Sequence, residues 1–400
     1  MEKQTTRPAH LRLLFLLTSI YSLNFTGRMI LSPLLPAMEQ DLGMNHGQAG
    51  SLFLMTSIGY FFTMIGSGFV ASRLGHRRCI IFAALLGGSA LLLAGLGHSL
   101  ITLFGAFFLL GLTAGLYFPS GVATITNLIP QHHWGRSLGL HETGTNLGMV
   151  LAPFLAEAFV SWLSWGSGLA LFGVLLITAG LTYLFFGPKE LIFGQAPMPA
   201  SIGRICRRPA FWHMVIVFSL ATGGSMGLYS MMPLFLVTAH DWARPWANTV
   251  VALSRIPSII SVLLGGWLAD RAGLARSMMG CLLLNGIMIV SVGLLSDRLL
   301  MISIFLQTAM ASCFFPIAYA AMAHLGRPEE RNLIVALIVA QGVLIGGGAI
   351  PTAIGFLSQT WSFSHSVVAT GVLALAAASS LLFYKPPRLP VDSRQEPNET

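Results

Sequence analysis

Twelve apolar stretches, many of them near 20 residues, follow one another along this chain of 400 residues. A helix of about 20 residues crosses the roughly 30 Å of hydrocarbon in a bilayer, because each residue rises about 1.5 Å. The stretches therefore predict an all-α membrane protein with twelve transmembrane helices. The predicted spans are 12–37, 47–72, 78–97, 100–127, 135–160, 165–187, 210–238, 246–270, 277–296, 299–325, 332–358 and 363–384.

Only 9% of the residues are charged, against about a quarter in a soluble domain, so the composition excludes a soluble surface. If the N-terminus is placed inside, 18 of the 22 lysines and arginines fall in the inner segments, and only Arg244 and Arg298 in outer loops. Basic residues gather on the cytoplasmic side of membrane proteins. The net charge of +8 therefore indicates orientation rather than nucleic-acid binding. We expect a multi-pass protein of the inner (cytoplasmic) membrane with both termini cytoplasmic.

The second half of the chain repeats the first. Residues 67–78 read SGFVASRLGHRR, and residues 265–276 read GGWLADRAGLAR. A nearly constant offset of 198 recurs in several spans, which predicts two parallel repeats. At that offset, Gly266, Arg271, Gly273, Gly342, Gly346 and Pro351 fall on Gly68, Arg73, Gly75, Gly144, Gly148 and Pro153.

The largest interruption of the apolar pattern, at 188–209, is rich in proline and arginine and separates six spans from six spans. The predicted organisation is a six-helix bundle at 1–187, a cytoplasmic linker at 188–209, a second bundle at 210–384 and a cytoplasmic tail at 385–400.

The stretch GGWLADRAGLAR resembles the G-x-x-x-D-R-x-G-x-R/K signature of the major facilitator superfamily, and GTNLGMVLAP at 144–153 resembles its glycine–proline motif. With the twelve spans, the resemblance covers almost the whole chain. It implies two six-helix bundles around a central cavity lined by the first, fourth, seventh and tenth helices.

The resemblance also implies a gate at the cytoplasmic side. Asp270 and Arg271 would hold that side shut by meeting the fifth helix near Arg136, since a carboxylate is attracted to a helix N-terminus. The first copy has Ser72 in place of the aspartate, so its loop, with Arg73, should bind more weakly. The alternative is that these charges only orient the protein. The gating residues that the resemblance implies are Asp270, Arg271, Arg73, Gly75, Gly273 and Arg136.

Two arginines lie inside predicted spans, Arg28 in the first and Arg255 in the eighth. Ionisable groups there are costly and usually face a cavity or a partner. Both lie roughly 6 Å to the outer side of the midplane, at 1.5 Å per residue. Because a guanidinium binds carboxylate or phosphate through two parallel hydrogen bonds, the pair predicts an anionic substrate. The alternative is a structural ion pair with a buried acid, for which Glu157 is one candidate.

Aromatic and polar residues of central helices complete the predicted substrate site. Tyr21 and Asn24 share one face of the first span with Arg28. Tyr117, Tyr229 and Tyr319 lie on the fourth, seventh and tenth spans, which the resemblance places at the cavity. Each could instead bond to a neighbouring helix, which is the commoner role.

Glu142, with His141, lies in HETGTNLG near the start of the fifth span. A carboxylate in a membrane and a histidine can both exchange protons near neutral pH, so these two residues predict proton coupling. The alternative is a structural ion pair of Glu142 with Arg136 or Arg271.

Two transport functions fit this sequence. The first is a secondary active transporter working by alternating access, which moves a small organic anion, a carboxylate or a phosphate ester, with proton coupling. The alternative is a proton-driven multidrug exporter of amphipathic compounds, since the helix-five motif resembles that of antiporters.

We see no catalytic constellation and expect no enzyme activity. HETGT lacks the second histidine of H-E-x-x-H, so no metal site is predicted, and no cofactor is expected. The expected partners are a small-molecule substrate, protons and the lipid bilayer, with no nucleic acid, and we expect a monomer.

Overall fold

The computed structural model describes residues 7–97, 99–196 and 199–383, and it confirms the twelve predicted spans. Lys3 and the predicted tail 385–400 lie outside the described residues. The observed spans are His10–Leu42, His46–Leu74, His76–Leu96, Leu100–Leu128, Gln131–Trp162, Trp165–Phe186, Pro209–Ala239, Arg244–Ala272, Leu274–Leu294, Asp297–Met322, Arg331–Thr360 and Phe363–Ser380.

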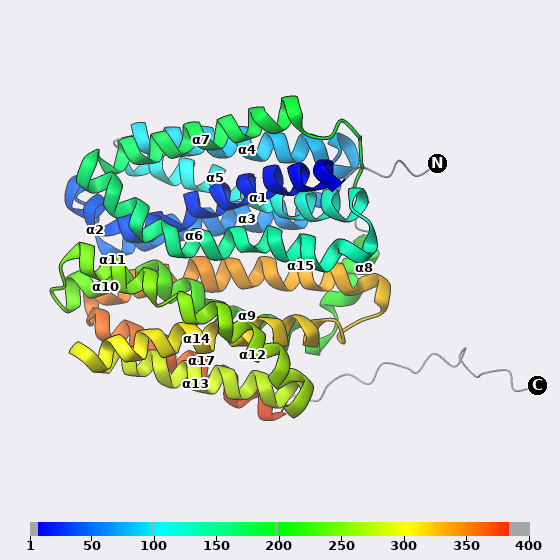
Figure 1. The fold of residues 1–400 in the computed structure, drawn as a ribbon. Helices are drawn as coiled ribbons and strands as arrows, with labels where there is room; N and C mark the ends of the chain where they lie inside the picture. Colours follow the sequence, from blue (N-terminus) through cyan, green and yellow to red (C-terminus); the bar gives the residue numbers. More distant parts are fainter. Residues whose placement is uncertain (1–6, 98, 197–198, 384–400) are drawn as a thin grey trace, which may run out of the picture.

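The first six spans form the upper body in Figure 1 and the last six the lower body, with the short helix α8 (Pro199–Cys206) between them in the chain. We refer to these bodies as the N-half and the C-half. The N-half contains α1 (Arg7–Met29), α2 (Leu31–Leu42), α3 (His46–Leu74), α4 (His76–Leu96), α5 (Leu100–Leu128), η1 (Gln131–His133), α6 (Trp134–Trp162) and α7 (Trp165–Phe186).

The C-half repeats this order with more interruptions, because two π-helical turns, η2 and η4, divide its first and fifth spans. It contains α9 (Pro209–Thr222), η2 (Gly223–Gly227), α10 (Leu228–Ala239), α11 (Arg244–Leu253), α12 (Ile256–Ala272), α13 (Leu274–Leu294), α14 (Asp297–Met322), η3 (Pro328–Glu330), α15 (Arg331–Gly342), η4 (Val343–Ala349), α16 (Ile350–Thr360), α17 (Phe363–Ser380) and η5 (Leu381–Phe383).

The repeat in the sequence is also a repeat in helix packing. A Cβ atom added at Gly148 on α6 would lie 2.8 Å from Thr26 Oγ1 on α1. One added at the equivalent Gly346 on η4 would lie 2.4 Å from the Ser219 carbonyl oxygen on α9. Small residues let helices approach this closely in a membrane. The glycine motif therefore brings the fifth span against the first in both halves.

Two glycines of the loop signature have a conformational reason. Gly75 and Gly273 follow α3 and α12 directly, with φ of 78° and 81°. Residues other than glycine rarely adopt a positive φ of this size. Each glycine lets the chain leave one membrane helix and enter the next without a longer loop.

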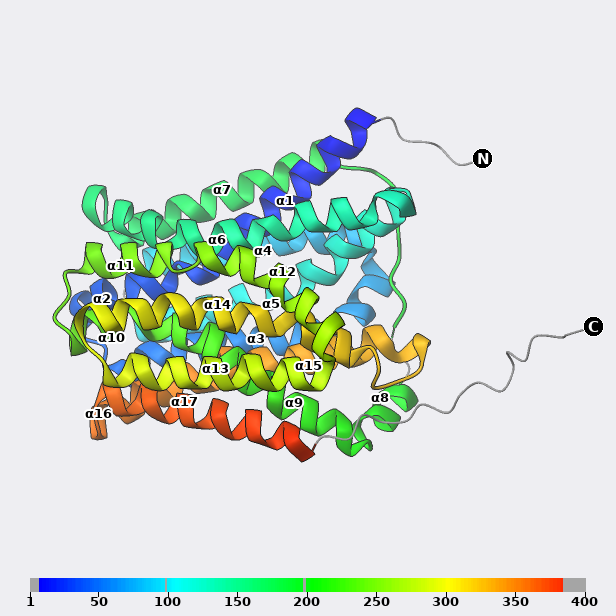
Figure 2. The same cartoon turned by 60° about the horizontal axis from the view of Figure 1, so that its bottom comes forward.

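The linker is fastened to both halves. Ahead of α8, the backbone N–H of His76 donates to Ile192 at 2.8 Å, and that of Gly194 donates to Ala71 at 3.1 Å. On the other side, Glu330 of the C-half forms ion pairs with Arg204 on α8, at 3.2 Å, and with Arg208, at 2.9 Å. We call the end of the molecule where α8 lies the linker end; α1 begins and α17 finishes there too (Figures 1 and 2).

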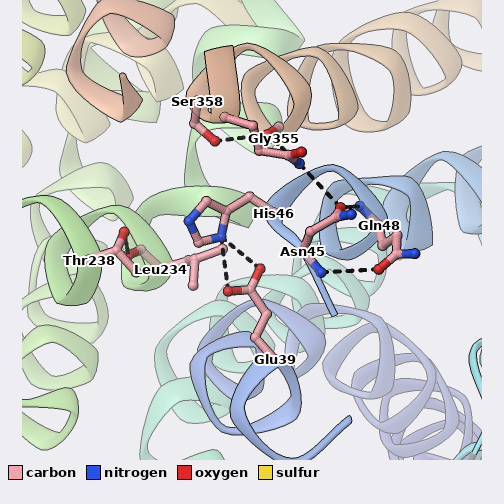
Figure 3. Close-up of polar contacts among 9 residues, drawn as sticks. Glu39, Asn45, His46, Gln48, Leu234, Thr238, Gly355 and Ser358 are labelled. Carbon is pink, nitrogen blue, oxygen red and sulfur yellow. Dashed lines mark hydrogen bonds and ion pairs between the residues drawn. The ribbon is translucent and has the colours of Figure 1, made fainter. Parts of the chain in front are cut away.

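The two halves bond to each other at the opposite end, which we call the far end. The start of α3 lies between α10 and α16 there (Figure 3). Asn45 caps α3 by accepting from the Gln48 N–H at 2.9 Å, and it also accepts from Gln359 of the C-half at 3.2 Å. Thr352 donates to the Gly50 carbonyl at 3.1 Å. These bonds close the far end.

Candidate functional site

Both intramembrane arginines lie beside an interruption of their span. Arg28 is three residues before the start of α2, which has Pro33 in its first turn, and Arg255 directly precedes α12, with Pro257 in its first turn. Proline has no N–H to donate and fits best in the first turn of a helix. The two prolines therefore favour a break in the helix close to each arginine.

Each guanidinium packs on the ring of a tyrosine that reaches the other half. Arg28 Cζ lies 5.7 Å from the ring centroid of Tyr60, which belongs to an apolar cluster with Ala340 of the C-half. Arg255 Cζ lies 4.4 Å from the ring of Tyr229, whose hydroxyl donates to the Met149 carbonyl of the N-half at 3.3 Å. Both arginines thus lie near the contact between the halves, held by cation–π interactions.

Neither guanidinium forms a hydrogen bond or an ion pair with any residue in the described part of the chain, and the Nε atoms of Arg28 and Arg255 are buried without a hydrogen-bond partner there. Arg255 is only 5% exposed. An unpaired charge in such a place is expensive for the fold, so it is retained for a reason other than stability.

The alternative that Glu157 pairs with one of these arginines is wrong. Glu157 forms two hydrogen bonds with Arg244, at 2.9 and 3.1 Å, and accepts a third from Asn248 at 3.3 Å. Because Arg244 and Asn248 belong to α11, this cluster ties α6 to the C-half near the far end. The sequence shows Arg244 only as an outer-loop charge, so it gives no sign of this pairing.

Tyr117 and Asn24 make the intrabundle bonds that are the alternative to substrate binding. The Tyr117 hydroxyl donates to the Leu17 carbonyl of α1 at 2.6 Å, and Asn24 donates to Thr113 of α5 at 3.3 Å; both side chains are buried. Tyr21 stacks on the His141 ring with centroids 4.3 Å apart. These residues form one packed aromatic layer inside the N-half.

Glu142 differs from its neighbour His141, because its side chain is 49% exposed whereas that of His141 is fully buried. The carboxylate interacts electrostatically with Tyr60 of α3 and with Tyr319 of α14, so groups from both halves surround it. Tyr319 is itself 43% exposed although it lies within α14. No ion pair of Glu142 with Arg136 or Arg271 occurs among the described residues.

The predicted gate is not formed in this structure. Asp270 and Arg136 are exposed and make no ion pair within the described ranges, and Arg271 packs on its own neighbour Trp267, with Cζ 4.7 Å from the ring centroid. Arg73 is exposed as well. The halves are therefore bonded to each other at the far end, whereas this gate at the linker end is not made, and Glu142 is exposed.

Tyr60 and Glu330 are two residues that the sequence analysis missed. In the sequence, Tyr60 could have been recognised as a candidate site residue because it is a tyrosine near the middle of a predicted span. Glu330 looks like a loop acid beside Glu329, yet it is buried and paired with two arginines. The described residues contain no group of three or more His, Cys, Asp or Glu side chains suited to a metal ion.

We expect Glu330→Gln to lower the free energy of unfolding by about 1–3 kcal/mol, because it removes the charge of a buried acceptor that is paired with two arginines. Thermal unfolding midpoints of the purified protein measure this, with the exposed neighbour change Glu329→Gln as the matched control. Equal midpoints for the two variants would contradict the structural role of Glu330.

The same residue gives a pH dependence. Burial raises the pKa of the Glu330 carboxyl, but the hydrogen bonds from Arg208 and the Arg327 N–H and the charges of Arg208 and Arg204 outweigh it, so the pKa lies below its ordinary value. This stabilisation is complete above the pKa of an unfolded carboxyl and is lost as the pH falls through the lower folded value. The stability gap between wild type and Glu330→Gln should therefore shrink in acid.

The sequence profile of the Major Facilitator Superfamily matches residues 17–255 and 242–400. This chain belongs to the major facilitator superfamily. The fold agrees with this assignment. The described residues form twelve helices of membrane-spanning length and no strands, and the glycine motif occurs in both halves.

Solved structures agree with that assignment. A bacterial homolog of the human lysosomal transporter Spinster, in an inward-facing and occupied conformation, has a TM-score of 0.83 with 18% identity, covering 95% of this chain and 97% of that chain. At this identity the similarity shows the fold alone.

Two curated relatives are transporters of different kinds. A probable sulfoacetate transporter of Cupriavidus necator is 23% identical over 290 residues, 67% of this chain and 66% of that protein. A multidrug resistance protein of Enterobacter lignolyticus is 26% identical over 282 residues, 65% of each chain. Each match spans just under two thirds of the relative's length. Membership of the major facilitator superfamily is therefore established, and the activity and substrate of this chain are separate questions.

The far-end cluster makes a conformational prediction, because any opening at that end would separate Glu157 from Arg244. We expect Glu157→Gln to shift the resting population toward an open far end by about 10- to 150-fold, since hydrogen bonds to charged groups contribute about 1.5–3 kcal/mol. The distance between spin labels at Trp162→Cys and Trp361→Cys measures this shift in a background without the four native cysteines. An unchanged distance distribution would show that other contacts hold this end shut.

Proposed function

We propose that this protein is a secondary active transporter that moves a small organic anion, a carboxylate or a phosphate ester, together with protons. The observation that carries the proposal is the pair of guanidinium groups, Arg28 and Arg255, neither of which has an anionic partner in the described chain. A bound anion would compensate both charges through bidentate hydrogen bonds. The sulfoacetate relative supports this class of substrate, since sulfoacetate is an organic anion.

The proposed site takes one arginine from each half. Arg28 and Tyr60 belong to the N-half, and Arg255 and Tyr229 to the C-half. An anion that binds both guanidinium groups links the two halves, so its binding energy can favour one conformation over another. Tyr319 is an exposed candidate contact on α14. Tyr21, Tyr117 and Asn24 support the site from behind, because they are buried within the N-half.

Proton coupling is proposed at Glu142 and His141. The Glu142 side chain is 49% exposed, which supports proton exchange with the solution in a state that is open at the linker end. With the linker end at the cytoplasm, as the distribution of basic residues predicts, this is an inward-facing state of an inner-membrane protein. In the closed state Asp270 and Arg271 would approach Arg136, and the opposite end would open.

A ligand screen on the purified protein tests the substrate class. Ligands that bind the folded state raise its melting temperature. We expect sulfoacetate, monocarboxylates or phosphate esters to raise the midpoint of the wild type but not that of Arg28→Gln or Arg255→Gln. The multidrug relative supports the alternative of an exporter of amphipathic compounds. Stabilisation by cationic drugs that persists in both variants would favour that exporter and reject the anion carrier.

A further inference from the structure

The protonation of His141 can be worked out from its neighbours. The ring is buried on α6 between Tyr21 of α1, with centroids 4.3 Å apart and planes 4° from parallel, and Tyr117 of α5. His141 Nε2 lies 3.2 Å from the Tyr117 hydroxyl oxygen. That hydroxyl in turn lies 2.6 Å from the Leu17 carbonyl oxygen.

A tyrosine hydroxyl has a single proton to donate, and a carbonyl oxygen can only accept. The Tyr117 proton therefore goes to Leu17, and the hydroxyl oxygen must accept from His141. It follows that Nε2 of His141 carries a hydrogen. In the neutral ring the lone pair is then on Nδ1.

That Nδ1 atom is buried and has no hydrogen-bond partner among the described residues. Oε1 of Glu142 lies 4.0 Å from it. This is longer than a hydrogen bond, but the Glu142 side chain is half exposed, and a small rotation would bring its oxygen within about 3 Å. Glu142 thus lies between the solution and a buried acceptor with a free lone pair.

We propose that Tyr117 and the Leu17 carbonyl are positioning groups that hold His141 as the Nε2–H tautomer, so that Nδ1 accepts a proton from Glu142. This inference rests on the proposed proton coupling. In the transfer the O–H bond of Glu142 breaks and an N–H bond forms at Nδ1. A carboxylic acid and a neutral imidazole become a carboxylate and an imidazolium, with one proton retained by the pair.

The surroundings suit that exchange. Four tyrosines interact electrostatically with Glu142: Tyr21 of α1, Tyr60 of α3, Tyr117 of α5 and Tyr319 of α14. Arg28 also interacts with Tyr21 and Tyr60. The face of Tyr21 stabilises an imidazolium stacked on it by a cation–π interaction. The proton can therefore lie on either residue at modest cost.

The first test observes the tautomer directly. Nitrogen-15 NMR of the full chain, with labelled histidine and in lipid bilayers, distinguishes a protonated from an unprotonated ring nitrogen, and His141→Gln assigns the signal. We expect Nε2–H in the wild type and a gain of Nδ1–H in Tyr117→Phe. Tyr21→Phe is the matched control, because its ring also stacks on His141 but its hydroxyl does not bond to it; it should keep the wild-type tautomer. Nδ1–H in the wild type would overturn the proposal, as would an unchanged tautomer in Tyr117→Phe.

The second test measures proton uptake of the purified protein after a pH jump, with a pH indicator and no substrate. We expect the wild type to take up one proton and Glu142→Gln to take up none. In Tyr117→Phe its midpoint should move to lower pH by about 0.5–1 unit, a three- to tenfold loss of proton affinity, because the imidazolium loses the acceptor for its Nε2–H. An unshifted midpoint would overturn the role of Tyr117. Neither test needs a substrate, so a failed anion hypothesis would leave both results standing.

Discussion

Arg255→Gln and Arg28→Gln should each weaken binding and transport of the anion by about 30-fold to 5,000-fold. Removing one partner of a buried charged hydrogen-bond pair costs about 2–5 kcal/mol, which corresponds to that range. Arg255 should give the larger effect, because it is the more buried of the two. Binding of a labelled anion to the purified protein and uptake into proteoliposomes measure both quantities. Arg298→Gln, at an exposed position at the start of α14, is the matched control and should behave as wild type.

An apolar replacement of Arg255 should stabilise the empty protein, because it removes an unpaired buried charge. Replacing buried charges with well-packed apolar groups is often neutral or stabilising by about 1–4 kcal/mol. Arg255→Met should therefore melt at a higher temperature than the wild type while it fails to bind. A variant that loses both stability and binding would point to a structural role and contradict the substrate site. Arg255→Lys should retain only part of the affinity, since an ammonium cannot form the two-bond fork.

Glu142→Gln should abolish pH-driven accumulation but leave exchange of the anion across the membrane intact. A glutamine keeps the shape of the side chain but binds no proton. For one proton per singly charged anion, a gradient of one pH unit supports about tenfold accumulation, since one unit corresponds to 1.36 kcal/mol. Proteoliposomes of the wild type should approach that ratio, and those of Glu142→Gln should equilibrate near one.

The control for that experiment is Glu190→Gln, at an exposed position on the linker. It should accumulate the anion as the wild type does. Intact pH-driven accumulation in Glu142→Gln would remove Glu142 from the coupling mechanism. Loss of exchange as well would show that the residue is needed for binding or for the conformational change rather than for coupling.

The predictable parts of this fold follow from two properties of the sequence, the hydropathy along the chain and the spacing of its glycines. Hydropathy marks every span, and the ends differ from prediction mainly because capping residues such as Asn45 and breaks such as that before Pro257 act on single turns. The repeat was also visible, since a glycine that must lie against a neighbouring backbone, such as Gly346, recurs at a fixed spacing.

The site was harder to predict, because it depends on how each helix is rotated about its axis. His141 and Glu142 are adjacent in the sequence, yet one is buried against Tyr117 and the other is exposed. Tyr60 was missed although Arg28 packs on it, because nothing in the chain near either residue indicates the contact. The pairing of Glu157 with Arg244 likewise depends on the docking of the two halves, which local sequence does not encode.

The attachment of the linker sets a limit on how far the molecule can open. Gly194 is bonded to the N-half, and α8, which begins at Pro199, is tied to the C-half through Arg204 and Glu330. Five residues of fully extended chain reach at most about 18 Å, and the helical segment from Pro199 to Arg204 adds about 8 Å. While both attachments hold, the two halves cannot separate at the linker end beyond that reach, and a bulkier cargo would have to detach one of them to pass.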